Sequence, residues 1–418
     1  MAIAIEQESQ FVNLHQLKNS PKYHLRFAPA SVGHALITSL KRGLTVSKKV
    51  VVVGGGIIGT MHAYLALQKG YSVVQCERDA TPQSASMRNF GLIWVSGREA
   101  GKELEVALRA REIWGEVGAN VPATGFRGNG SLTIARDKAE MGVLEEANSM
   151  SDARERGFTL LTRAETEALE PVLAGDFVGS LRCTQDAAAE PKYLLSALRE
   201  YLRTNDNYQW VPNFEVSDFT HNEAGNHVTD VKGITLSGDL VVFCPGAFHK
   251  GFLATYFVDA PVRRVRLQMA STVRLPEKLG HSVADADSLR YYPAFKDLSL
   301  NKLPPQSQIA AENFMQLLMV QRLDGTLTIG DTHEYVEPFG HELIETPYEH
   351  LSGVISAIFG QSAPAIARRW DGIYSQSTNS DIYFRKTIAP GAVLVTGGGG
   401  RGNTISPAIA EETISQWD

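Results

Sequence analysis

The sequence predicts an α/β protein with two kinds of domain, one built on parallel β-α-β units and one on a largely antiparallel sheet. Three observations lead to this fold class. A strand, a glycine-rich turn, a helix and a second strand follow one another near residue 50. Further strand-and-turn segments alternate in blocks along the chain. The length of 418 residues exceeds one ordinary domain and suits two.

The β-α-β unit begins with a β-branched run at residues 50–53, which is typical of a strand buried on both faces. The run leads into a glycine-rich turn at residues 54–59. Residues 60–69 have apolar side chains at helical spacing. A second apolar strand at residues 71–76 then ends on Glu77, which completes the unit.

Each glycine of the turn has its own role. Gly54 permits the tight turn, Gly56 lets a pyrophosphate approach the backbone, and Gly59 lets the helix pack closely on the strand. The N–H groups at the start of the helix face the phosphates. Glu77 is placed to accept hydrogen bonds from a ribose hydroxyl, and a carboxylate there disfavours a 2′-phosphate. The unit predicts a Rossmann-type dinucleotide-binding domain without deciding between FAD and NAD.

Two later segments extend this domain. Residues 239–243 form a predicted strand that ends in a turn at residues 244–247. Residues 393–396 form another strand, and the glycine-rich loop at residues 397–404 follows it. A predicted helix at residues 405–417 ends the chain.

At these segments the chain resembles the D-amino-acid oxidase/sarcosine oxidase family of FAD-dependent oxidoreductases, from about Lys48 to the C-terminus. The resemblance implies FAD as the cofactor and a substrate site where the two domains meet. It rests on the glycine turn with Glu77, the Ser86-Arg88-Asn89-Gly91 segment, the Pro245-Gly246-Ala247 turn and the terminal glycine loop, in that order.

Within the family, residues 86–92, 263–269, 292–295 and 330–335 resemble a branch linked to phosphonate breakdown. That branch is thought to oxidise aminophosphonates related to 2-aminoethylphosphonate. The resemblance therefore implies a small amine as substrate. Hydride would pass from the carbon next to the amine nitrogen to flavin N5, and the resulting imine would hydrolyse.

The same resemblance implies which residues hold FAD. The pyrophosphate would lie on the glycine turn, the adenine against the backbone of Val216, and the pyrimidine edge of the flavin along the second glycine loop. The N–H groups of the C-terminal helix would stabilise the negative charge of reduced flavin. The implied cofactor residues are Gly54, Gly56, Ile58, Gly59, Glu77, Arg78, Ser84, Ser86, Arg88, Asn89, Val216, Gly246, Gly400, Arg401, Gly402, Asn403 and Thr404.

The cysteines bear on how FAD is attached. Sarcosine oxidases tether the flavin through a cysteine near the C-terminal domain segment, and no cysteine follows Cys244 here. We therefore expect non-covalent FAD. Cys76, Cys183 and Cys244 lie in apolar segments and are expected to be buried, reduced thiols. Those enzymes also use a lysine that speeds the reaction with oxygen, and residues 325–330 contain none. The electron acceptor, oxygen or another molecule, therefore stays open.

The alternation of segments predicts a discontinuous FAD-binding domain. We assign residues 47–130, 186–260 and 366–418 to this domain, residues 131–185 and 261–365 to an α+β substrate domain, and residues 1–46 to a flexible extension. The FAD-binding domain includes predicted helices at 98–117 and 192–204 and a meander at 214–234. The substrate domain has predicted strands at 131–135, 262–273, 288–294, 314–321 and 326–331, with helices near 138–156 and 348–359 on one side of the sheet.

An anionic substrate requires a cationic clamp, for which arginine offers the best fork. Arg322 and Arg385 are the first candidates because both lie beside segments expected to meet the flavin. Tyr291, Tyr292 and His333 are candidate pocket groups. The other cations considered for the clamp are Arg264, Arg266, Arg290 and Lys386.

The composition excludes several classes of protein. The formal net charge of −6 gives no sign of a nucleic-acid partner. No apolar run approaches the roughly 20 residues of a membrane span. The cysteine spacing offers no zinc site, no other metal is expected, and we expect a cytoplasmic protein.

Two alternatives to an aminophosphonate oxidoreductase stay open. One is an oxidase or dehydrogenase of a secondary, N-methyl or D-amino acid. The other is a flavoprotein whose FAD is structural or supports a partner protein.

Overall fold

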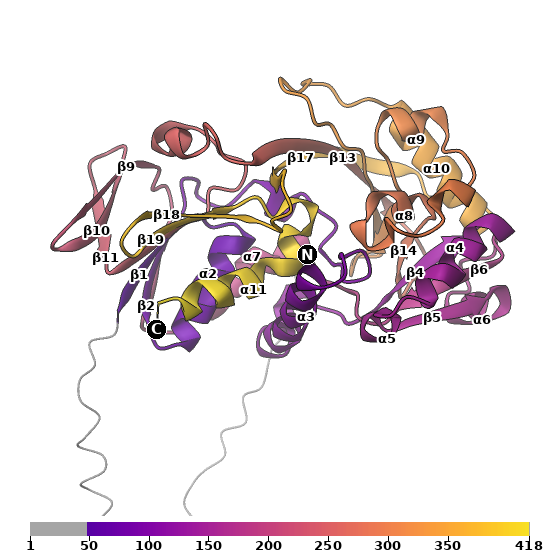
Figure 1. The fold of residues 1–418 in the computed structure, drawn as a ribbon, viewed down its shortest axis with the longest axis horizontal. Coiled ribbons are helices and arrows are strands. Elements are labelled where there is room, and N and C mark those ends of the chain that lie inside the picture. Colours follow the sequence, from indigo (N-terminus) through magenta and orange to yellow (C-terminus); the bar gives the residue numbers. More distant parts are fainter. Residues whose placement is uncertain (1–47, 418) are drawn as a thin grey trace, which may run out of the picture. The chain divides into compact units, whose positions relative to one another are not determined.

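The computed structural model describes residues 48–417, so the predicted extension 1–46 lies outside the described residues. The first of its two larger sheets contains β1 (Lys49–Val53), β2 (Ser72–Cys76), β8 (Tyr208–Val211), β12 (Leu240–Phe243), β18 (Phe384–Ala389) and β19 (Ala392–Thr396). The strand order is β18-β19-β12-β1-β2-β8, and all pairs are parallel except β18 with β19 (Figure 1). This is the predicted parallel core, with β1 in its middle.

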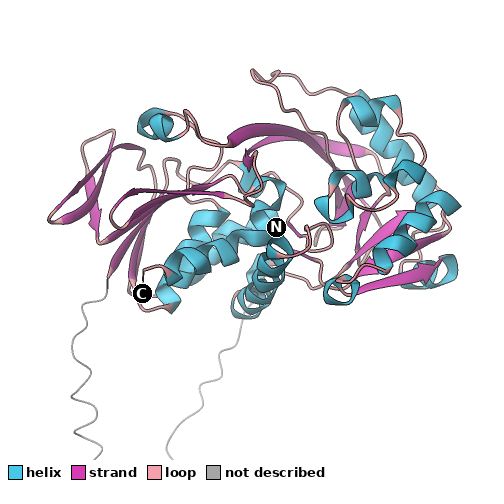
Figure 2. Ribbon diagram, in the orientation of Figure 1, coloured by secondary structure: helices cyan, strands magenta, loops and turns pink. Residues whose placement is uncertain are grey.

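The parallel sheet is buried on both faces, as the β-branched run predicted. Val50 and Val52 pack into one apolar cluster, whereas Val51 between them packs into another on the opposite face. The first cluster is covered by the helices α2 (Ile57–Gln68), α3 (Lys102–Asn120), α7 (Pro191–Leu202) and α11 (Gly402–Ser415). Helices α2 and α11 lie side by side against the sheet (Figure 2).

A small antiparallel meander covers the opposite face of the parallel sheet. Its strands are β9 (Val216–Asn222), β10 (Gly225–Asp230) and β11 (Thr235–Gly238), where a meander was predicted. Val228 of the meander packs with Val51 and Phe243 of the parallel sheet. The two apolar faces thereby fix the position of β1, whose carboxyl end leads into the glycine turn.

The second larger sheet has eight strands and is antiparallel apart from one pair. It contains β4 (Ser131–Ala135), β5 (Phe158–Thr162), β6 (Gly179–Cys183), β13 (Val262–Arg274), β14 (Ser282–Ala284), β15 (Leu318–Gln321), β16 (Thr326–Gly330) and β17 (Ile366–Ser377). The order is β17-β13-β16-β15-β14-β4-β6-β5, with β14 and β4 parallel. Strand β17 pairs with β13 along its length, from the pair Val262 and Ser377 to the pair Thr272 and Ile366. Residues 366–377, which we assigned to the FAD-binding domain, therefore belong to the second sheet and not to the parallel sheet.

Helices cover both faces of the second sheet, where we expected them on one side. Helix α10 (Thr346–Phe359) packs with Met319 and Ile329, and α4 (Lys138–Asn148) packs with Leu181 on the other face. The shorter elements are α5 (Ala153–Arg156), α6 (Arg163–Leu169), α8 (Asp287–Tyr291), α9 (Gln308–Glu312) and the ladder of β3 (Leu92–Ile93) with β7 (Ala187–Ala188). No helix within residues 48–417 combines the length and apolar character that crossing a membrane requires.

The predicted strand at residues 288–294 is wrong. The segment forms α8 and then a 3-10 turn at Pro293–Phe295. Its aromatic and branched residues favour a strand locally. In the fold, Ser288, Leu289 and Tyr292 are the buried positions, and this spacing matches a helical face.

Candidate active site

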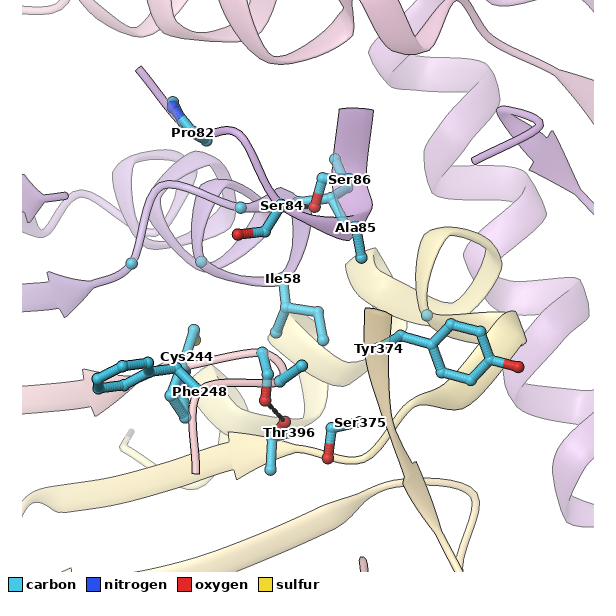
Figure 3. A pocket seen from close by; sticks show the side chains of 18 of the residues that line it. Ile58, Pro82, Ser84, Ala85, Ser86, Cys244, Phe248, Tyr374, Ser375 and Thr396 are labelled. Carbon is cyan, nitrogen blue, oxygen red and sulfur yellow. Dashed lines mark hydrogen bonds between the residues drawn. The ribbon is translucent and has the colours of Figure 1, made fainter. Parts of the chain in front are cut away.

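One cleft receives residues from both larger sheets. It opens beyond the carboxyl ends of β1, β2, β12 and β19, and Leu267 and Met269 of β13 line it from the second sheet. Its empty volume, mouth included, is about 1670 Å³. Figure 3 shows Ser84 and Ser86 on one side of Ile58, and Cys244 and Thr396 on the other. The carboxyl end of a parallel sheet is where open α/β folds bind their ligands.

The glycine turn is closely packed under this cleft. Gly54 has a φ of +120°, and its N–H donates to the carbonyl of Cys76 at 2.8 Å. A Cβ on Gly54 would stand 2.5 Å from the carbonyl oxygen of Cys244, and one on Gly59 would stand 2.2 Å from that of Gly54. Only glycine fits at these two positions, so the turn brings bare backbone to the cleft as predicted.

The start of α2 is open to a negatively charged ligand. Helix α2 has no acidic residue in its first turn, and its N-cap is Gly56. The N–H of Ile57 donates to Oγ of Ser86 at 2.9 Å, which brings the segment after β2 across the helix start. Because the first N–H groups of a helix lack carbonyl partners within it, this end suits the pyrophosphate of a dinucleotide.

Glu77 holds the turn from the second strand. One oxygen of its carboxylate accepts from the N–H of Gly55 at 2.7 Å, and the other accepts from the N–H of Asp79 at 3.2 Å. The neighbouring Arg78 guanidinium lies over the ring of Phe248 at 4.7 Å. The carboxylate therefore sits at the end of β2 beside the turn, where a ribose hydroxyl is expected.

The second glycine loop lies at the other end of the cleft. A Cβ on Gly400 would stand 3.7 Å from the hydroxyl of Tyr291 and 3.7 Å from that of Tyr374, at ordinary contact distance. Helix α11 begins at Gly402, earlier than the predicted Ile405, and carries no acid in its first turn. Asn403 donates to the carbonyl of Leu92 at 3.0 Å, which fixes the loop against β3.

Two predicted cofactor residues do not line the cleft. Arg401 pairs with Glu103 at 2.8 Å, and Thr404 accepts at Oγ1 from the N–H of Trp94 at 2.9 Å. Arg98 also pairs with Glu103, at 3.5 Å. Burial would raise the pKa of Glu103, but the two guanidiniums together lower it. The other implied residues all line the cleft: Gly54, Gly56, Ile58, Gly59, Glu77, Arg78, Ser84, Ser86, Arg88, Asn89, Val216, Gly246, Gly400, Gly402 and Asn403.

Arg322 and Arg385 do not form the predicted clamp. Arg322 donates to Thr328 at 2.7 Å, to the carbonyl of Ala189 at 3.2 Å and to the carbonyl of Phe90. Burial lowers the pKa of Arg322 to about 10. Arg385 donates to Thr413 at 2.7 Å and pairs with Glu412 at 3.1 Å on α11. Neither residue lines the cleft, so both serve as internal links of the fold.

The other candidate cations are also engaged elsewhere. Arg266 pairs with Asp371 at 2.9 Å, and Lys386 lies over the ring of Tyr256 at 5.6 Å. Arg264 pairs with Glu337 at 3.0 Å, and Arg290 pairs with Asp287 at 3.1 Å.

Tyr291 and His333 belong to one cluster with Asp331, a cleft residue that we did not predict. The His333 ring stacks on Tyr291 at 4.4 Å, and its Nε2 lies 3.8 Å from Oδ2 of Asp331. Asp331 lines the cleft together with Tyr374 of β17. Asp331 follows β16 directly, and a carboxylate at the end of a strand is the signal that could have found it. Tyr292 lies behind this cluster, against Trp94.

Comparison with known proteins agrees with this geometry. The family described as "FAD dependent oxidoreductase" (DAO) matches residues 49–416, which is nearly all of the chain. The chain belongs to this family. FAD is therefore its cofactor, and the bare turn and the two open helix starts fit that group.

Solved structures add to the comparison. Glycine oxidase from Bacillus cereus has a TM-score of 0.71 at 17% identity, covering 89% of this chain and 96% of that chain. L-proline dehydrogenase from P. horikoshii also has a TM-score of 0.71, at 18% identity over 89% and 94%. Iminodiacetate oxidase from Chelativorans sp. BNC1 has a TM-score of 0.68 at 18% identity over 87% and 93%. These likenesses show the fold.

A curated relative, one of the subunits of the opine oxidase from Rhizobium meliloti, is 30% identical over 166 residues. The match covers 36% of this chain and 43% of the relative, so it spans less than half of that protein. Within residues 48–417, no group of three or more His, Cys, Asp or Glu side chains is arranged to hold a metal ion.

Proposed function

We propose that this protein oxidises a small amine or amino acid with non-covalently bound FAD. One observation carries the proposal: two bare glycine loops, each leading into a helix start, end in the same cleft as a buried carboxyl group, that of Asp331. Bound FAD would supply the acceptor for a hydride from the carbon next to the amine nitrogen. The resulting imine would hydrolyse to an aldehyde or keto product.

The residues of the chain supply binding, orientation and a water-poor wall. The N–H groups of α2 and α11 would hold the pyrophosphate and the pyrimidine edge of the flavin. Leu267 and Met269 form an apolar part of the cleft wall. An apolar surface disfavours a charged ammonium, so it favours the neutral amine from which hydride can leave.

The named relatives agree with a small amino acid or secondary amine as substrate. Glycine, proline and iminodiacetate each carry a carboxylate one carbon from the nitrogen. An anionic group of this kind needs a cation at the cleft. Arg263 has an exposed side chain and makes no ion pair within the described part of the chain. It lies outside the residues that line the cleft, but it shares its face of β13 with Leu267 and Met269, which do line it, and we propose that it reaches the anion from there.

Arg263 stands beside the polar cluster of the cleft. Its guanidinium lies 4.0 Å over the ring of Tyr335, and that ring stacks on His333. Its Nε donates to Gln376 at 2.8 Å, which leaves the two terminal nitrogens for a ligand. A carboxylate or a phosphonate would suit this fork equally.

Aminophosphonate oxidation is the narrower form of the proposal. It rests on the resemblance of residues 86–92, 263–269, 292–295 and 330–335 to the phosphonate-linked branch. A phosphonate and a carboxylate need the same kind of cation. Experiment must therefore distinguish an aminophosphonate substrate from an amino acid.

The test is anaerobic mixing of the FAD-loaded protein with a panel of amines. The panel contains glycine, N-methylglycine, proline, iminodiacetate, 2-aminoethylphosphonate and its N-methyl derivative. Loss of the visible flavin band with any member supports amine oxidation, and the fastest member names the substrate class. A band that persists with every member would leave FAD in a structural or partner-supporting role. FAD that stays in solution after acid precipitation of the protein supports non-covalent binding.

A further inference from the structure

A buried carboxylate oxygen in the cleft lacks a partner. Asp331 is 5% exposed, and its Oδ1 makes no hydrogen bond. The hydroxyl of Tyr374, also in the cleft wall, and Oε1 of Gln316 are likewise buried without a partner. Leaving a buried polar group unpaired is unfavourable, and more so if the group is charged. A wall of this kind is therefore prepared for a polar ligand.

The acidic residues of the cleft differ in how they are used. Both carboxylate oxygens of Glu77 accept hydrogen bonds, one from the N–H of Gly55 and the other from the N–H of Asp79. Glu215 is exposed beside the meander. Among the cleft residues that the structure describes, Asp331 is the one whose carboxyl group is buried. Within residues 48–417, the imidazole of His333 is its one ion-pair partner. No lysine or arginine there neutralises it, so the missing partner is expected to be a cation or an N–H donor.

The orientation of His333 leaves Oδ1 free for that ligand. Nδ1 of His333 lies 3.0 Å from the carbonyl oxygen of Phe314. A carbonyl only accepts hydrogen bonds, so Nδ1 carries the hydrogen and Nε2 is the atom that faces Oδ2 of Asp331. The His333 ring therefore lies on the Oδ2 side of the carboxylate, and Oδ1 is the oxygen without a partner, on a residue that lines the cleft.

We propose that Asp331 receives the nitrogen of the substrate and takes its ammonium proton, so that the amine is neutral when oxidation begins. This inference rests on the proposed amine substrate. In the step, one N–H bond of the ammonium breaks, its electron pair stays on nitrogen, and an O–H bond forms at Asp331. His333 is a positioning residue for this group. Burial raises the pKa of Asp331, against the opposing effects of His333, of the Gln316 side chain and of a backbone N–H group, and this makes the carboxylate a stronger base than an exposed aspartate.

The direct test compares Asp331→Asn with Asp297→Asn, a matched change at an exposed aspartate outside the cleft lining. Each panel amine is paired with the acid that lacks its nitrogen, such as acetate for glycine and ethylphosphonate for 2-aminoethylphosphonate. The Kd of the amine comes from the concentration dependence of anaerobic flavin reduction. The Kd of the nitrogen-free acid comes from the change it causes in the flavin spectrum.

The proposal predicts that Asp331→Asn weakens amine binding about tenfold or more. Binding of the nitrogen-free acid should stay within about twofold, and Asp297→Asn should change neither Kd. An equal change in both Kd values, or no change in either, would overturn the assignment while amine oxidation itself stood. If no amine reduces the wild-type flavin, the proposed function fails and the role of Asp331 fails with it.

The wild-type protein decides the matter if Asp331→Asn does not fold with FAD. Amine binding, relative to the nitrogen-free acid, should strengthen as pH rises and Asp331 ionises. A ratio of the two Kd values that stays constant over the pH range would contradict the proposal. The other titratable side chains around Asp331 are His333 and the four tyrosines Tyr291, Tyr292, Tyr335 and Tyr374.

The four tyrosines do not contribute to the pH dependence of the Kd ratio where Asp331 ionises. Burial, the largest cause, raises the pKa of each of the four above its ordinary value. They therefore stay neutral in the range where Asp331 ionises. A histidine that loses its positive charge as pH rises would act in the same direction, so the same ratio is compared between the wild type and His333→Gln.

Discussion

Oδ2 of Asp331 lies 3.8 Å from Nε2 of His333, while Oδ1 of the same carboxyl has no partner. The two residues come from the short segment that follows β16, and that segment meets the cleft between the two larger sheets. A carboxyl with one oxygen that lacks a partner can bind an amine and accept its proton. Substitutions at this cluster and in the fold around it test the arrangement.

Replacing His333 by Gln should shift the pH profile of flavin reduction toward higher pH. His333 lowers the pKa of Asp331, so its loss lets burial raise that pKa further. The measurement is the pH dependence of the anaerobic reduction rate with the best amine of the panel. His341→Gln, at a side chain that is 94% exposed, is the control and should leave the profile in place. Profiles that coincide for all three proteins would show that His333 does not act on Asp331.

Gly59→Ala should yield protein with little bound FAD. The added methyl would lie 2.2 Å from the carbonyl oxygen of Gly54, so the turn must shift, at a cost of about 1–3 kcal/mol. Gly142→Ala in α4 is the matched control, because a Cβ there meets nothing within 4 Å. The ratio of flavin to protein absorbance after purification measures the outcome. Equal FAD content in the two variants would mean that the turn does not carry the cofactor.

Arg385→Ala should lower stability and leave substrate binding unchanged. Arg385 joins β18 to α11 through Glu412 and Thr413, and its side chain is only 16% exposed. Loss of these contacts should cost about 1–3 kcal/mol. The melting temperature and the KM for the best amine report the two effects separately. A raised KM with an unchanged melting temperature would instead indicate that Arg385 binds the substrate.

Stability should fall as pH rises because of Asp285. Burial, followed by the charge of Asp287, raises the pKa of Asp285 from 3.8 to about 8. Between these values the folded chain keeps a proton that the unfolded chain releases, so the free energy of unfolding decreases with pH. Asp285→Asn should flatten this slope. Melting temperatures across that pH range measure it, and a slope identical to that of the wild type would refute the assignment.

The parts of the fold that the sequence revealed are those with a local cause. The glycine turn at Gly54, the strand before it and the helix after it follow from spacing within about 25 residues. The same holds for the second glycine loop before α11 and for the meander at β9–β11. Each needs a particular backbone conformation or a particular apolar period, and both are visible in a short window.

The parts that the sequence hid depend on distant partners. Strand β17 follows the second sheet because it pairs with β13, about a hundred residues away. Arg322 and Arg385 resembled ligand-binding cations until their partners on other segments were known. Asp331 offered only its place at the end of a strand. Its proposed role follows from burial and an oxygen without a partner, which only the folded chain reveals.

The central claim is that this member of the FAD-dependent oxidoreductase family oxidises a small amine. Anaerobic mixing of the FAD-loaded protein with the amine panel tests it most directly. We predict that at least one amine removes the visible flavin band in a single exponential phase, with a rate that saturates as amine concentration rises. A flavin band that every amine leaves intact, in protein that dithionite still reduces, would contradict the claim.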